Sequence, residues 1–201
     1  MSVLAFANEM TGWSEKIAAG LILARQHYRL ASVKCDSPVL ILPLNGSKRL
    51  YYSNQIYECA PGAFLLLNGA LDASVENIPN ENGPYKAWAI PFSWELVNIA
   101  RALVSTELEK RPKDGQSNAV MCAEVSAKLF DALADHLQLM SKNRSPAEQS
   151  VSVLRIMVAL HEAGASSFLW TTKPSYSAQF RALVSTQPER DWSSLDFEAA
   201  L

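Results

Sequence analysis

The chain has 201 residues, of which 49% are hydrophobic and 19% are charged, and its formal net charge is −2. This composition supports a domain with a substantial core and excludes a disordered chain. The small net charge gives no sign of a surface that binds a nucleic-acid backbone. The longest apolar runs, residues 38–44 and 63–67, are too short to cross a bilayer, so we expect a cytoplasmic protein that does not enter the membrane.

Residues 20–92 have the short apolar runs and turn signals of β-structure. Turn dipeptides occur at Asn45-Gly46, Ser53-Asn54 and Pro61-Gly62, and a polar cluster follows at residues 80–84. Strands at this spacing predict a small sandwich or barrel.

After Ser93 the apolar residues follow a helical period. One predicted helix begins at Trp94, and a second covers residues 120–140 with an apolar stripe that includes Leu129 and Leu133. Ser145 and Glu148 form a predicted capping box for a third helix, with Pro146 at its first position and Gly164 as its stop signal.

The third helix is apolar around more of its circumference than one contact surface requires. We therefore predict that the helical half forms a homodimer, with Leu129, Leu133, Leu154 and Met157 at the contact. The alternative is that both apolar stripes are covered within one chain.

The sequence contains no pattern typical of a catalytic or metal site. It has three histidines, and only His27 lies in the strand-rich half, so we expect no metal, no cofactor and no enzymatic activity. Cys35, Cys59 and Cys122 are widely spaced and are predicted to be reduced thiols. Gly-Ser-Lys at 46–48 lacks the earlier glycine of a phosphate loop, and we interpret it as a turn with Lys48 exposed.

Aromatic side chains within the predicted strands are candidates for a small-molecule pocket inside the barrel. We select Tyr52, Phe64 and Trp88, because Tyr52 is in register with Leu50 and the other two lie in the most apolar strands. The alternative is that these side chains only fill the core.

The last residues have the chemistry of a helix start. Ser193 is a candidate cap, Asp196 suits the positive end of a helix, and Trp192 and Phe197 could pack together as a hydrophobic staple. Such a short helix is marginal alone, so we expect it to belong to a domain that lies mostly beyond residue 201.

Two parts of the chain resemble AraC/XylS-type transcriptional regulators. Residues 20–110 resemble the N-terminal regulatory domain of that family, and Trp192, Asp196, Phe197 and Leu201 resemble the opening of its DNA-binding domain. The resemblance implies an α+β fold with a cupin-like antiparallel β-barrel at 1–93, a helical linker and dimerisation segment at 94–170, and a truncated helix-turn-helix domain at 175–201. The positions that carry the first resemblance are Gly46, Ser47, Lys48, Tyr57, Gly62, Pro84 and Tyr85.

The resemblance also implies the function of an effector-sensing and dimerisation domain. Its partner would be a small-molecule effector or a regulatory protein, and DNA would be bound only through the missing C-terminal domain. Two alternatives stay open: a protein-binding regulatory module with a filled barrel, and a metal-free cupin enzyme.

Overall fold

A computed structural model describes residues 20–69, 71–105, 119–142 and 145–171 of the chain. The chain divides into two compact units, Met1–Thr171 and Thr172–Leu201, and the described residues all belong to the first. The predicted start of a helix-turn-helix domain at 175–201 lies outside the described residues.

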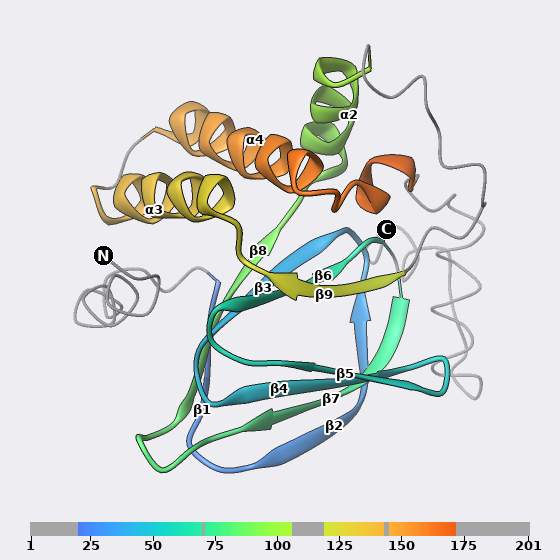
Figure 1. The fold of residues 1–201 in the computed structure, drawn as a ribbon, viewed down its shortest axis with the longest axis vertical. Coiled ribbons are helices and arrows are strands. Elements are labelled where there is room, and N and C mark those ends of the chain that lie inside the picture. The colour runs from blue at the N-terminus through green and yellow to red at the C-terminus, as the bar shows by residue number, and fades with distance from the viewer. Residues whose placement is uncertain (1–19, 70, 106–118, 143–144, 172–201) are drawn as a thin grey trace, which may run out of the picture. The chain divides into compact units, whose positions relative to one another are not determined.

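Two antiparallel β-sheets are formed by strands within residues 21–91 and by one later strand at 120–124 (Figure 1). Every strand pairing within them is antiparallel. The five-stranded sheet has the order β1 (Leu21–Ala24), β8 (Tyr85–Pro91), β3 (Val39–Asn45), β6 (Ala63–Leu67) and β9 (Val120–Glu124). The four-stranded sheet has the order β2 (Tyr28–Cys35), β7 (Leu71–Ile78), β4 (Ser47–Tyr52) and β5 (Gln55–Cys59).

The helices lie together on the outer side of the five-stranded sheet (Figure 1). Within the described residues they are α2 (Trp94–Leu103), α3 (Ala127–Ser141), α4 (Pro146–Glu162) and the short 3₁₀ helix η1 (Ser167–Trp170). No helix in the described part of the chain is long and apolar enough to cross a membrane. The predicted α+β class, with a cupin-like antiparallel domain followed by helices, is confirmed, although the strands form two separate sheets.

Local capping chemistry fixes where α4 begins and ends. The Ser145 side chain accepts from the backbone N–H of Glu148, whose carboxylate accepts from the N–H of Ser145, and Pro146 is the first helical residue. Gly164 follows the last turn with a φ of 83°, a conformation that glycine adopts without strain. The predicted capping box and stop signal are therefore confirmed.

The five-stranded sheet is buried on both faces, which explains its continuous apolar runs. In β3, Leu40 and Leu42 pack in the cluster that contains the helices, whereas Ile41 packs in the cluster between the sheets. In β6, Leu66 packs in the cluster with the helices and Leu65 packs in the cluster between the sheets. Successive side chains of a strand point to opposite faces, so a sheet covered on both sides loses the usual alternation of apolar and polar residues.

Two turn signals have different structural roles. Ser53 and Asn54 connect the paired strands β4 and β5, and both have positive φ, 50° and 62°, as a two-residue hairpin requires. Gly46 instead joins β3 to β4, which belong to different sheets. Its φ is 72°, and a Cβ at this position would lie 2.3 Å from the carbonyl oxygen of Ile78. The chain can cross between the sheets here because Gly46 has no side chain.

The end of the unit is held by a side chain of α2. The guanidinium of Arg101 donates to the carbonyl of Leu169 at 2.6 Å and to the carbonyl of Thr171 at 2.7 Å. A planar guanidinium can serve two acceptors at once, so one side chain fixes the backbone on both sides of Trp170.

One predicted helix begins too early. The prediction placed a helix at 120–140, but Val120–Glu124 is strand β9, which pairs with β6, and the helix starts at Ala127 after the Ser126 cap. The apolar residues of β9 fit a helical stripe in the sequence. These residues form a strand because they pair with β6, which lies more than fifty residues earlier in the chain. The local hydrophobic period carries no information about such a distant pairing.

Candidate functional site

A pocket of about 600 Å³ lies between the five-stranded sheet and the helices. This volume is within the range of small-molecule sites in proteins. Trp88 and Ile90 of β8 contribute its strand side, and Met140 of α3 and Val153 of α4 contribute its helix side. The other described lining residues are Gly20, Val39, Ala89, Pro91, Leu96, His136, Pro146, Gln149 and Ser150. Most of the lining is apolar, so its polar groups determine how a ligand would be oriented.

His136 is the buried polar side chain of this pocket. Its Nδ1 lies 2.7 Å from the hydroxyl oxygen of Ser152, and that hydroxyl donates to the carbonyl of Gln149 at 2.7 Å. Ser152 has a single hydroxyl proton, so its oxygen must accept from the Nδ1–H of His136. Burial lowers the pKa of His136, which favours the neutral imidazole. In that neutral form Nδ1 carries the proton and Nε2 carries a lone pair.

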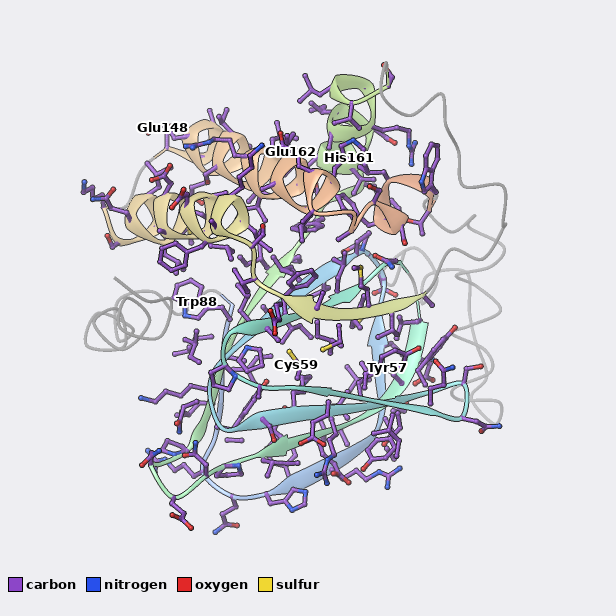
Figure 2. The ribbon with its side chains drawn as sticks, in the orientation of Figure 1. Tyr57, Cys59, Trp88, Glu148, His161 and Glu162 are labelled. Carbon is purple, nitrogen blue, oxygen red and sulfur yellow. The ribbon has the colours of Figure 1, made fainter. Side chains whose placement is uncertain are left out.

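The structure does not bring the three selected aromatic residues together. Tyr52 packs at the edge of the cluster between the sheets, as expected. Phe64 and Trp88 are almost fully buried, but they lie on the opposite face of the five-stranded sheet, in the cluster with the helices. Figure 2 shows Trp88 below α3. Of the three, Trp88 lines the pocket. The expectation that Phe64 and Trp88 point inside the barrel is wrong, because alternation along their strands directs both side chains toward the helices.

A second polar group is buried between the two sheets. Lys48 is only 4% exposed, and its Nζ donates to Oδ1 of Asn77 at 2.7 Å. Asn77 in turn donates to the hydroxyl of Tyr28 at 2.7 Å. The prediction that Lys48 is exposed in a turn is wrong, because Lys48 shares its strand face with the buried Leu50. The alternation along β4 is the signal that could have identified it.

The surroundings of Lys48 are poor in compensating charge. Burial lowers its pKa to about 8, and the nearby thiols of Cys35 and Cys59 oppose this shift only in part. Burial also raises the pKa of Cys59, which Figure 2 shows between the sheets, and the pKa of Tyr85. The Tyr85 hydroxyl is buried without a hydrogen-bond partner, and Lys48 Nζ lies 5.7 Å from the centre of its ring. The thiols and the phenol are thus held neutral.

We expect the lowered pKa of Lys48 to appear as a pH-dependent stability. Below pH 8 the ammonium is charged in both the folded and the unfolded chain, and its burial cost is fully present. Above pH 8 the folded form loses the proton first, so the free energy of unfolding should rise by about 1 kcal/mol between pH 7 and pH 9.

The measurement is urea denaturation at both pH values for the wild type and Lys48→Met. The methionine variant removes the titrating group and should lack this rise, while shared effects of the thiols cancel in the difference. An equal pH dependence in both proteins would contradict the assignment.

Most residues of the predicted dimer contact are buried in the core of a single chain. Leu129, Leu133 and Met157 are at most 3% exposed and pack beneath the helices. Leu154 is only partly buried and lines a surface groove of about 480 Å³ between α3 and α4. Three of the four residues are therefore unavailable to a partner in this structure.

In the described part of the chain, no three histidine, cysteine or acidic side chains gather as metal ligands. His27 lies 3.6 Å from Glu76, and Cys35, Cys59 and Cys122 are free thiols. His161 bonds the Ser166 hydroxyl at 2.7 Å near the end of α4. His27 and His161 thus each have a structural partner.

Comparison with known proteins identifies the family. No curated protein matches the sequence. Among solved structures, an apo ToxT variant from Vibrio cholerae has a TM-score of 0.59 at 14% identity, covering 89% of this chain and 68% of that chain. ToxT of the same organism with a bound unsaturated fatty acid has a TM-score of 0.54 at 13% identity, covering 90% and 66%. ToxT bound to (E)-4-(8-methylnaphthalen-1-yl)but-3-enoic acid also scores 0.54 at 13% identity, covering 90% and 70%.

At these identities the structural likeness shows a shared fold. The sequence itself matches the family described as AraC-type transcriptional regulator N-terminus over residues 19–154. This match spans well over half of the chain, and the chain therefore belongs to the family of AraC-type transcriptional regulator N-terminal domains.

Proposed function

We propose that this domain senses a small apolar effector, which binds in the pocket between the five-stranded sheet and the helices. The observation that carries the proposal is the 600 Å³ pocket itself, whose walls come from β8 on one side and from α3 and α4 on the other. A ligand that contacts both layers can favour one arrangement of sheet and helices over another. Such a population shift is what a regulatory domain requires, and no enzymatic activity is part of the proposal.

The ligands of structurally similar proteins support an apolar effector. ToxT has been solved with an unsaturated fatty acid and with a methylnaphthalenyl butenoic acid, each of which has a large apolar body. The pocket of this chain offers Trp88, Ile90, Met140 and Val153 to such a body. A bicyclic aromatic compound is well within its volume.

The test is calorimetric titration of the protein with 1-naphthol and 1-methoxynaphthalene. Val153→Trp should fill the pocket and weaken both compounds at least tenfold, since its side chain replaces the space that the ligand needs. Ile99→Trp is the matched control, because Ile99 is exposed on α2 and lines no part of this pocket. Circular dichroism verifies that both variants are folded. Absence of binding, or binding unchanged by Val153→Trp, would contradict the proposal.

We also propose that a second copy of the chain covers the groove between α3 and α4. Leu103 and Val151 beside this groove are 62% and 58% exposed, which is unusual for large apolar side chains so close together. Charges of both signs surround them, so a two-fold arrangement can place unlike charges opposite one another. The charged lining residues are Lys128, Asp131, Arg155 and Glu162.

Sedimentation at micromolar concentration tests this association. We expect a dimer for the wild type and a monomer for the double variant Val151→Asp with Leu154→Asp. The new carboxylates would lose their water at the interface and would face the same negative charges on the second copy. Ile99→Asp, on the surface of α2, should leave the dimer intact. A monomeric wild type would rule out this contact.

A further inference from the structure

The pocket between the sheet and the helices contains a buried histidine, His136, in a mostly apolar lining. Building on the proposed function, we infer that the pocket selects a neutral effector with a hydroxyl group, a phenol or an alcohol, which donates a hydrogen bond to Nε2 of His136. The apolar body of the effector would lie against Trp88, Ile90 and Val153.

The direction of this hydrogen bond follows from the partners of His136. The Ser152 hydroxyl gives its only proton to the Gln149 carbonyl, so it accepts the proton of His136 Nδ1. With Nδ1 occupied, Nε2 is the ring nitrogen that remains for a ligand in the pocket. A neutral imidazole with its proton on Nδ1 presents a lone pair at Nε2, and this lone pair accepts but cannot donate. A ligand hydroxyl satisfies it, whereas an ether oxygen does not.

The charge of the lining argues against an acidic ligand. Among the described residues that line this pocket there is no Lys, Arg, Asp or Glu. The buried Lys48 packs between the two sheets, on the far side of the five-stranded sheet from the helices. A carboxylate in the pocket would lose its water without gaining a cation, which is costly in an apolar site. The ligand class therefore differs from the carboxylic acids bound in the ToxT structures.

The experiment compares three compounds with one bicyclic body on the full chain: 1-naphthol, 1-methoxynaphthalene and 1-naphthoate. Naphthol donates a hydrogen bond, the methyl ether only accepts, and naphthoate carries a negative charge. We expect the wild type to bind naphthol about 3- to 10-fold more tightly than the ether, the range that one net hydrogen bond provides, and to bind naphthoate most weakly.

Two variants separate the role of His136 from general packing. Ser152→Ala removes the acceptor that fixes the proton on Nδ1, so the tautomer with its proton on Nε2 becomes accessible. The ratio of the affinities for naphthol and for the methyl ether should then approach one. His136→Phe removes the acceptor but keeps a ring of similar shape, and it should weaken naphthol to the level of the ether. In the wild type, naphthol should also shift the ¹⁵N resonance of His136 Nε2, and the ether should not.

The outcomes distinguish this inference from the proposed function. If naphthol and the ether bind equally well, or if naphthoate binds most tightly, the pocket is retained and the inference about His136 is overturned. If the preference survives in both Ser152→Ala and His136→Phe, the donor contacts another group and the inference is again overturned. If none of the three compounds binds, both the inference and the proposed pocket are overturned.

Discussion

Replacing Gly46 by alanine is expected to destabilise the domain by roughly 3 to 5 kcal/mol, the range of severe backbone and packing defects. Gly46 has a φ of 72°, which alanine adopts only with strain. The new methyl group would also lie 2.3 Å from the carbonyl oxygen of Ile78 and 3.3 Å from the Cα of Tyr85. Both neighbours are backbone atoms, so neither can rotate away, and relief requires the crossing between the two sheets to open.

Gly62→Ala is the matched control for this prediction. Gly62 also has a positive φ, 94°, but a Cβ there would meet no atom within 4 Å. It should therefore show only the conformational cost of about 1 to 2 kcal/mol. Urea denaturation of the two variants beside the wild type measures the difference. Equal destabilisation would mean that the close approach to Ile78 contributes nothing.

Phe168→Ala should have an effect of similar size, about 3 to 5 kcal/mol, as is usual for removal of a buried phenylalanine. Phe168 in η1 is fully buried, and its ring centre lies 5.5 Å from that of Phe92, which is also fully buried. These two rings join the end of the unit to the junction of β8 and α2. Truncation would leave a cavity in the cluster that binds the helices to the sheet.

Thermal and urea denaturation test this prediction with two companion variants. Phe168→Leu keeps most of the buried volume and should lose less than half as much stability. Ile99→Ala changes an exposed side chain and should be close to neutral. If Phe168→Ala were as mild as Ile99→Ala, η1 would not be part of the cooperative core.

Features governed by local chemistry could be predicted from the sequence. The cap at Ser145, the stop at Gly164 and the hairpin at Ser53 and Asn54 are each decided by residues a few positions apart. The change from strands to helices near Ser93 follows from the hydrophobic period alone. These features were confirmed because their causes are contained in short segments.

Features governed by distant contacts could not be predicted in the same way. Strand β9 forms because β6 offers it an edge, and its own residues would equally suit a helix. Phe64 and Trp88 were assigned to the wrong face because both faces of their sheet are buried. For Leu129 and Met157, the sequence shows an apolar stripe but does not show whether the same chain covers it.

The candidate site combines both cases. Trp88 lines the pocket, but from the face of the sheet opposite to the predicted barrel interior. The sequence predicts no role for His136, because the position of its ring proton depends on a hydrogen bond to Ser152, which lies on the neighbouring helix. The pocket is formed by residues from β8, α3 and α4, so its existence depends on how the helices dock on the sheet.

The hydrogen bonds from Arg101 to Leu169 and Thr171 connect α2 to the last described residues of the chain. Strand β8 forms one wall of the pocket, and only Phe92 and Ser93 separate it from α2, which carries Arg101. The path from the pocket wall to Leu169 and Thr171 therefore consists of β8, two connecting residues, α2 and the two hydrogen bonds of Arg101. We expect a ligand that shifts β8 to move Arg101 with it and so to shift the backbone at Leu169 and Thr171.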